Sequence, residues 1–490
     1  MVRDDRHAKY LYEYLTHPDV GAVSMVLEPD YVDRDYLDDY AAYYVSCFYP
    51  YDRFCKRLHF FKEAISRQRF RKIIRGEASP ASLERFKKAY LGFIVVRPLP
   101  EAMIGRTQLK TYEDDGGRRQ YTAIRKYEVH LVGITLSVKS MAFQEQDRAV
   151  AACATVALWS CFQQTAYLFG TAAPRPPVIT ADATSSLYHR RALPSNGLRV
   201  EQICSAIRQN GLDPEVFPQQ GITPSLIYGY LRAGIPLLMI ADVESYDEQS
   251  HAIALNGYSM VDHRVGEERL YSGPDPAIDY VATPMRGMYI KEFYGHDDQI
   301  GPFSHLYVTM PTAKDRPFTM KGSWKIKGTD VDATITPRQI VAPLYRKIRL
   351  TFLEARAALA NIVLFAQRVL ALYGFDRNAW DWDIYLTTTN EYKEDLRKSS
   401  LLTHARRDHL LLKSQPRFFW RCILRVGATQ VMEVGVDATE FTKSNPVFLV
   451  NHFDPVFEGL FTAQVSATPI SETFHPHLRN VLLREHRAVS

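Results

Sequence analysis

The sequence predicts an α+β protein of two to three domains, and three observations carry this prediction. A length of 490 residues is too great for one small domain. Long apolar runs of helical length, such as residues 148–169, alternate with short strand-like runs, such as residues 235–241. Hydrophobic residues make up 46% of the chain and charged residues 23%, an ordinary balance for a globular protein with large cores. We expect three segments: residues 1–140, 141–312 and 313–490.

The first segment predicts mixed helix and strand. Residues 83–90 have the pattern of a short helix, and residues 91–96 that of a buried strand that ends before two prolines. Apolar alternation within residues 127–138 indicates a further strand. The Asp114–Gly117 stretch predicts a turn before it. No role for this segment follows from its sequence.

The middle segment is the most informative. A buried helix is expected over residues 148–169, ended by Gly170, and an amphipathic helix over residues 199–210, ended by Gly211. Residues 225–233 predict another helix, and residues 235–241 an apolar strand. A second strand begins at His251, and a third covers residues 287–295 after a loop or insertion at 262–286.

The last segment begins with an expected helix over residues 341–373, which has a wide apolar face. Residues 418–426 and 430–436 then predict a β-hairpin joined at Gly427 and Ala428. The sequence therefore predicts a helical plus β-hairpin segment at this end of the chain.

Bulk charge and targeting signals narrow the class of protein. With 60 basic and 55 acidic residues the net charge is +5, which by itself gives no nucleic-acid signal, and we interpret the basic cluster Arg67–Arg75 as a solvated helix face. The charged N-terminus lacks the apolar core of a signal peptide, and no membrane span is expected. Six cysteines without a CxxC pair argue against a zinc ribbon and for reduced thiols in a cytoplasmic protein. No metal and no cofactor is expected.

Four side chains in the middle segment are of the types that thiol chemistry requires. Cys153 stands near the start of the predicted buried helix, His251 opens a strand, and the acid pair Asp297–Asp298 follows a later strand. A helix N-terminus and an imidazolium both stabilise a thiolate nucleophile, and a carboxylate orients the imidazole. Gln146 or Gln144 could donate its amide to a developing oxyanion. Either acid could be the orienting one.

Residues 141–305 carry a resemblance to the papain-like cysteine peptidase superfamily, nearest to the bacterial bacteriocin-processing (double-glycine) peptidase-like domains. The matching stretches are Gln144–Asp147 with Cys153–Thr155, Ala233–Leu238, His251–Tyr258 and Tyr294–Asp298. The resemblance implies a papain-like core, in which the helix bearing the cysteine packs on an antiparallel sheet. It also implies the roles of the residues: Cys153 as nucleophile, His251 as base, Asp297 as orienting acid and Gln146 as oxyanion donor.

The sequence thus favours a thiol hydrolase that cuts a peptide or isopeptide bond of a protein or peptide substrate through a Cys153 thioester. The same site could instead pass the acyl group to an amine, as in transglutamination, or deamidate a glutamine. A non-catalytic binding protein on a degenerate peptidase scaffold is the third possibility, since Ala152 and Ala154 flank Cys153. Two weaker candidates lie outside this segment: the carboxylate pair Asp381 and Asp383, and the metal pair His475 and His477.

Overall fold

The fold is that of a computed structural model covering all 490 residues. The residues that the structure describes are 6–100, 102–147, 152–185, 197–244, 250–261, 268–269, 282–310, 317–326, 329–375, 379–440, 446–467, 479 and 481.

The chain forms two compact units, each built from non-contiguous stretches. Unit 1 holds Met1–Gln220, Gly234–Met260 and Lys291–Leu344, and unit 2 holds Gly221–Ala233, Val261–Ile290 and Tyr345–Ser490. This differs from the three expected segments, with boundaries near residues 140 and 312. The reason lies in strand pairing: strands beyond residue 312 complete a sheet of unit 1, and the N-terminal segment packs on the same core.

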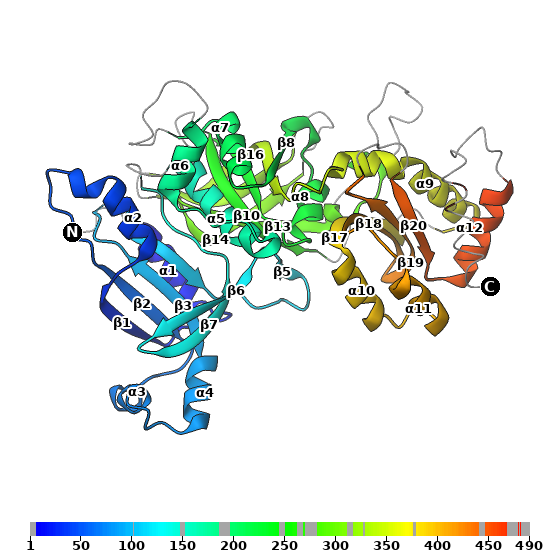
Figure 1. Cartoon of the computed structure of the whole chain (residues 1–490). Coiled ribbons are helices and arrows are strands. Elements are labelled where there is room, and N and C mark those ends of the chain that lie inside the picture. Colours follow the sequence, from blue (N-terminus) through cyan, green and yellow to red (C-terminus); the bar gives the residue numbers. More distant parts are fainter. Residues whose placement is uncertain are drawn as a thin grey trace. The chain divides into compact units, whose positions relative to one another are not determined.

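The N-terminal part of unit 1 is a four-stranded antiparallel sheet with helices around it (Figure 1). The strands pair in sequence order, so the sheet is a simple meander. The expected strand at 127–138 is instead a hairpin of two strands, because Val132 and Gly133 both adopt positive φ and turn the chain. The elements are α1 (Arg6–Thr16), β1 (Ser24–Tyr31), α2 (Arg34–Ala42), β2 (Cys55–Phe61), α3 (Arg67–Ile74), α4 (Pro80–Lys88), β3 (Tyr90–Val96), β4 (Ile104–Leu109), β6 (Arg125–Leu131) and β7 (Ile134–Ser140).

The rest of unit 1 is an antiparallel barrel with helices beside it. The strand order is β13-β14-β15-β16-β9-β10, and β10 also pairs with β13, so six strands close on themselves, while β5 and β8 extend the sheet. The strands are β5 (Arg119–Tyr121), β8 (Asp213–Pro218), β9 (Leu237–Val243), β10 (His251–Met260), β13 (Ile290–Asp297), β14 (Gly301–Thr309), β15 (Thr319–Ile326) and β16 (Thr329–Leu344); the helices are α5 (Cys153–Phe169), α6 (Pro176–Thr184) and α7 (Val200–Gln209).

Helix α5 is the core helix of unit 1 and packs against β10 and β9. Trp159, Cys161 and Phe162 are fully buried, as the apolar run in the sequence predicts. The helix ends at Gly170, whose φ of 71° is the left-handed conformation that stops helices, so this predicted stop is confirmed. Residues 148–151, the first part of the expected helix, lie outside the described residues.

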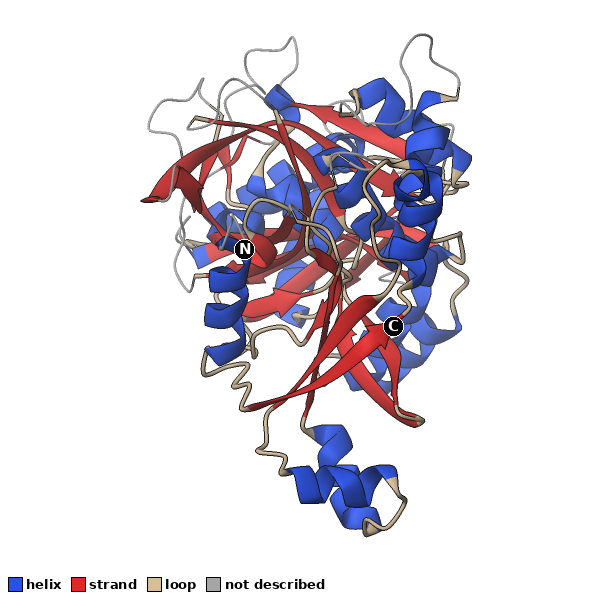
Figure 2. Cartoon of the chain, turned by 90° about the vertical axis from the view of Figure 1, so that its left-hand side faces the viewer, coloured by secondary structure: helices blue, strands red, loops and turns tan. Residues whose placement is uncertain are grey.

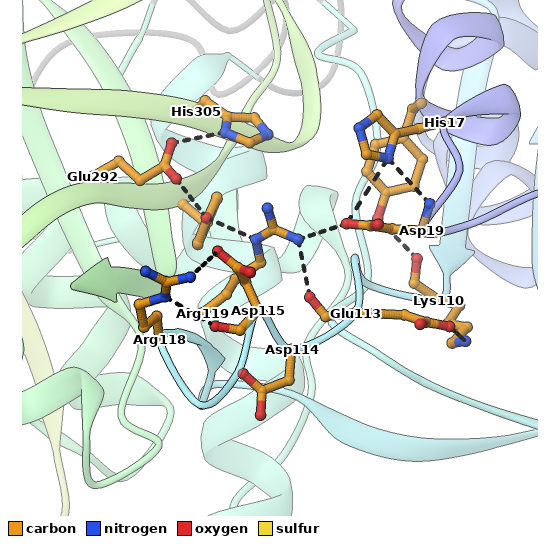
Figure 3. A network of polar contacts seen from close by, with 12 residues as sticks. His17, Asp19, Lys110, Glu113, Asp114, Asp115, Arg118, Arg119, Glu292 and His305 are labelled. Atoms are coloured by element: carbon orange, nitrogen blue, oxygen red, sulfur yellow. Dashed lines mark hydrogen bonds and ion pairs between the residues drawn. The ribbon is translucent and has the colours of Figure 1, made fainter. Parts of the chain in front are cut away.

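A polar network ties the N-terminal part of unit 1 to the barrel, and Figure 3 shows Arg119 at its centre. The Arg119 guanidinium donates to Asp19 at 2.6 Å, to the backbone oxygen of Glu113 at 2.9 Å and to the Tyr294 hydroxyl at 3.2 Å. Tyr294 in turn donates to Glu292, which also binds His305 at 2.8 Å. The network therefore joins the chain after α1 to strands β13 and β14.

Replacing Arg119 by methionine is expected to lower the free energy of unfolding by about 2 kcal/mol, because Asp19 and Tyr294 lose their donor in a largely enclosed setting. Chemical denaturation measures this. Arg118→Met is the matched control, since the Arg118 side chain is 47% exposed and pairs with the exposed Asp115. The control is expected to change stability by less than about 0.5 kcal/mol. Equal losses in both variants would contradict the assignment.

Unit 2 is a four-stranded antiparallel sheet flanked by helices on both faces. The predicted hairpin at 418–436 is confirmed as β18 and β19, but the expected helix at 341–373 begins only at Phe352, because the chain up to Leu344 pairs within the barrel as β16. Helix α9 has the length and apolarity of a membrane span, yet 56% of its most apolar window is buried, as in a core helix. The elements are α8 (Pro224–Leu231), β11 (Glu268–Arg269), β12 (Ala282–Thr283), α9 (Phe352–Leu372), β17 (Trp380–Thr388), α10 (Thr389–Lys398), α11 (His404–Leu412), β18 (Phe418–Val426), β19 (Thr429–Asp437), β20 (Val447–His452) and α12 (Pro455–Ala467).

One helical hairpin of unit 1 stands out in both Figure 1 and Figure 2. Helices α3 and α4 form a hairpin that extends beyond the end of the β1–β4 sheet. The remaining helices of unit 1 lie closer to its sheets.

Candidate active site

Strand pairing in the barrel brings a histidine and an acid together from positions 46 residues apart. His251 is the first residue of β10, and Asp297 is the last residue of β13, the strand that pairs with β10. The Nε2 atom of His251 lies 2.9 Å from Oδ1 of Asp297. Asp297 is itself held in place, because its Oδ1 also accepts the backbone N–H of Gln299 at 2.8 Å. The backbone therefore holds the carboxylate of Asp297 in place beside the His251 imidazole.

The third member of the group is Cys153, the first residue of α5. Its thiol lies close enough to the His251 imidazole to contribute to the raised pKa of His251. Asp297 engages the Nε2 atom of the same ring. Four of the six cysteines are buried, whereas Cys153 and Cys47 are partly exposed. The structure thus brings Cys153, His251 and Asp297 together, and Cys153 is partly exposed.

The surroundings of His251 favour its charged form. Burial alone lowers the pKa of His251, but the charge and hydrogen bond of Asp297, the hydrogen bond of Cys153 and the charge of Asp298 outweigh it. The pKa of the imidazole is raised well above its usual 6.5. An imidazolium next to a cysteine is the arrangement that stabilises a thiolate.

Asp298 is a second buried acid beside the same imidazole. Its Oδ1 lies 3.4 Å from Nε2 of His251, and neither of its carboxylate oxygens has a hydrogen-bond partner among the described residues. Burial raises the pKa of Asp298 to about 6, although the charge of His251 opposes this. Of the two acids, Asp297 makes the shorter contact with His251. Together the ligand atoms of His251, Asp297 and Asp298 lie within 4.8 Å of one another, so these three residues could hold a metal ion.

Two residues of helix α1 hold the turn that carries the two acids, and no pattern in the sequence predicts this contact. His7 in α1 lies with Nε2 at 2.9 Å from the backbone oxygen of Asp298 and with Nδ1 at 3.2 Å from Glu145. One turn further along α1, the Tyr10 hydroxyl donates to the backbone oxygen of Pro302 at 2.7 Å. A Cβ at Gly301 would lie 2.3 Å from the Tyr10 ring, so only glycine permits this packing.

His296, the residue of β13 directly before Asp297, has a structural role. Its Nε2 lies 3.0 Å from the backbone oxygen of Met141, and its Nδ1 accepts the N–H of Phe303 at 3.1 Å. Burial lowers the pKa of His296 to about 3, so it stays neutral. It fixes the segment before Gln144 against the barrel and does not take part in the Cys153 chain of contacts.

The two expected oxyanion donors, Gln144 and Gln146, form no hydrogen bond with Cys153 or His251 among the described residues. Gln144 is buried and Gln146 half-buried. The backbone offers another donor. The N-cap residue Ala152 has no side-chain oxygen, and as the first residue of α5 Cys153 has no intrahelical acceptor for its N–H.

The remaining candidates from the sequence have structural roles or cannot be placed. Cys161 is fully buried, and burial raises the pKa of its thiol strongly. In unit 2 the buried Asp383 lies 2.8 Å from Arg232 and 3.3 Å from Arg425; burial raises its pKa, but these arginines lower it more. A carboxylate held ionised in this way is not the proton donor that a paired-carboxylate hydrolase needs. His475 and His477 lie outside the described residues.

Comparison with known proteins adds no relative. No protein-family model matches the chain, and no curated protein is similar to it in sequence. The arrangement of Cys153, His251 and Asp297 is therefore the strongest pointer to function.

Proposed function

We propose that this protein is a thiol hydrolase that cleaves a peptide or isopeptide bond through a thioester on Cys153. The observation that carries the proposal is that His251 contacts Asp297 at 2.9 Å and lies close enough to Cys153 for the thiol to raise the pKa of the imidazole. A nucleophile, a base and a residue that orients the base are what acyl transfer by a thiol needs. Cys153 is also partly exposed, as a residue that a substrate must reach has to be.

In the first half of the reaction the Cys153 thiolate attacks the substrate carbonyl carbon. The carbonyl oxygen becomes an oxyanion, which the free N–H of Cys153 and the positive end of α5 stabilise. A second donor is proposed to be Gln146, with Gln144 as the other possibility. The C–N bond then breaks as the His251 imidazolium gives its proton to the departing amine, leaving the acyl group on the sulfur.

In the second half His251, now neutral, takes a proton from water, and the hydroxide attacks the thioester carbon. Collapse of this intermediate breaks the C–S bond, releases the acid and restores the thiolate beside an imidazolium. Asp297 keeps the imidazole in one orientation through both halves, because its own position is fixed by Gln299.

A papain-like core is consistent with this proposal. The cysteine begins a buried helix, the histidine begins a strand against which that helix packs, and the acid ends the neighbouring strand. The proposal also explains why the N-cap residue of α5, Ala152, makes no side-chain hydrogen bond to the helix. An alanine N-cap costs about 1 kcal/mol of helix stability relative to serine or aspartate, and it leaves the N–H groups free for an oxyanion.

Labelling by a cysteine-directed electrophile, followed by mass spectrometry, tests the proposal. We expect Cys153 to react first at pH 6.5, and at least about 50-fold faster than Cys47, given the small thiolate fraction of an ordinary cysteine at that pH. Cys47 is the internal control, because it is also partly exposed, but its thiol hydrogen-bonds the backbone oxygen of Tyr43, at 3.7 Å, and no histidine among the described residues. A peptide library should be cut by the wild type and left intact by Cys153→Ala.

The outcomes separate the alternatives. Labelling of Cys153 no faster than that of Cys47 or Cys204 would indicate a binding protein on a peptidase scaffold. Fast labelling with product formation only when an amine is added would indicate acyl transfer in place of hydrolysis. In both cases hydrolysis as the main activity would be wrong.

A further inference from the structure

The positive charge of this chain is concentrated in one small module of unit 1. Residues 63–88 contain eight basic and three acidic residues, a net charge of +5. This equals the net charge of the whole chain, so all other residues together are neutral. The even overall balance therefore conceals a local basic surface.

This module is an insertion between two paired strands. β2 and β3 are antiparallel neighbours with Phe61 opposite Tyr90, and Lys62 donates its N–H to the backbone oxygen of Ala89 at 2.8 Å. Two strands so joined need a turn of only a few residues. The chain instead makes the α3–α4 hairpin, residues 63–88, which extends beyond the sheet (Figures 1 and 2). Because the sheet does not need the hairpin, its sequence is free to serve another purpose.

The hairpin points its apolar side chains inward and its cations outward. Phe70 and Ile73 lie on one face of α3, and Phe70 contacts Phe86 of α4, which stacks on Phe61. At 100° per residue, Arg71, Lys72 and Arg75 fall on the opposite face.

Arg67, Arg71 and Arg75 follow one another at intervals of one helical turn, and all three are exposed, as is Lys72. None of these four forms an ion pair with the residues that the structure describes, whereas Glu63 pairs with Arg69 and Arg85. Four cations on one outward face thus have no acidic partner.

We propose that the α3–α4 hairpin binds the phosphate backbone of double-stranded nucleic acid. A duplex presents about one negative charge per 1.7 Å of its axis, which a line of cations on a helix complements. The hairpin has no exposed aromatic residue, so it lacks the stacking surface that single strands require. Ile74 is its one exposed large hydrophobic residue, too little to anchor a membrane surface.

The binding is expected to be independent of base sequence and to depend strongly on salt. With four phosphate contacts, affinity should fall about 100-fold between roughly 50 and 200 mM salt, because each contact releases counterions. Duplex binding by the hairpin does not depend on the thiol chemistry of Cys153. A variant that loses duplex binding therefore says nothing against the proposed hydrolase, and the reverse also holds.

Fluorescence anisotropy with short duplexes of DNA and of RNA tests the proposal on the full chain. The variant Arg67→Gln, Arg71→Gln, Lys72→Gln, Arg75→Gln is expected to lose at least about 100-fold in affinity at low salt, while its thermal stability stays unchanged. The matched control neutralises four exposed lysines on strands of unit 1, Lys56, Lys126, Lys139 and Lys321. It should keep duplex affinity within about threefold.

Preference for DNA or RNA duplexes identifies the source of the phosphates, and either supports the proposal. Three results overturn it: no duplex binding by the wild type, equal losses in the two variants, or binding to phosphatidylserine vesicles without duplex binding. The last would assign the basic face to an anionic membrane surface instead.

Discussion

His251→Ala is expected to slow alkylation of Cys153 by about 100-fold at pH 6 and by only a few-fold at pH 9.5. An ordinary thiol with a pKa near 8.5 is about 0.3% thiolate at pH 6, whereas a thiolate–imidazolium pair is almost fully ionised, and its lower intrinsic nucleophilicity offsets part of the gain. The pKa of His251 is raised well above 6.5, so in the wild type the imidazolium persists beyond neutral pH. The rate of iodoacetamide incorporation, followed from pH 5 to pH 10, measures the effect.

His305→Gln is the matched control for this variant. His305 is also a histidine of the barrel in contact with a buried carboxylate, since its Nδ1 lies 2.8 Å from Glu292, but it has no contact with Cys153. Its replacement is expected to leave the pH profile of Cys153 alkylation unchanged. Identical profiles for wild type and His251→Ala would show that the imidazole does not activate the sulfur, and the proposed hydrolase would then lose its base.

The sequence predicts the positions of two candidate site residues well where the argument is local. Cys153 at a helix start and His251 at a strand start follow from periodicity and from Gly170 as a stop signal, and both positions are confirmed. The choice between Asp297 and Asp298 could not be made from sequence, because adjacent residues at a strand end differ only in which face they occupy. The distances of 2.9 and 3.4 Å to Nε2 of His251 decide it.

Long-range contacts explain what the sequence missed. His7 is 291 residues from Asp298, and no local pattern joins a helix at the start of the chain to a turn in the barrel. The last residues of β16, Val341–Leu344, lie within the stretch that predicted a longer helix, and only their pairing with β8 and β9 separates the strand from the helix. The basic residues of the α3–α4 hairpin are visible in the sequence. That the hairpin is an insertion between the paired strands β2 and β3 is not, because the pairing is known only from the structure.

Asp298→Asn is expected to raise the free energy of unfolding at pH 7.5 by on the order of 2 kcal/mol. The pKa of Asp298 is about 6 in the fold, against 3.8 ordinarily, which corresponds to about 3 kcal/mol of cost when the carboxyl is ionised. Because the folded state holds this proton more tightly than the unfolded state, the stability of the wild type should fall as pH rises from about 4 to 6. Asparagine does not titrate, so the variant should lack this fall, and the two proteins should converge below pH 4.

Asp297→Asn separates the two acids, because it removes the negative charge 2.9 Å from the His251 ring, while its amide oxygen can still accept the Gln299 N–H. This variant is expected to lose stability at pH 7.5 and to slow Cys153 alkylation, whereas Asp298→Asn should keep the wild-type alkylation rate within about threefold. Urea denaturation at several pH values and alkylation kinetics on the same samples distinguish them. If Asp298→Asn were the variant that lost both, Asp298 would be the acid that orients His251, and the unpartnered carboxylate would have a catalytic purpose. A wild-type alkylation rate for Asp298→Asn, together with its higher stability at pH 7.5, would instead leave Asp297 as the acid that orients His251, because only the 2.9 Å contact would then matter for the activity of the sulfur.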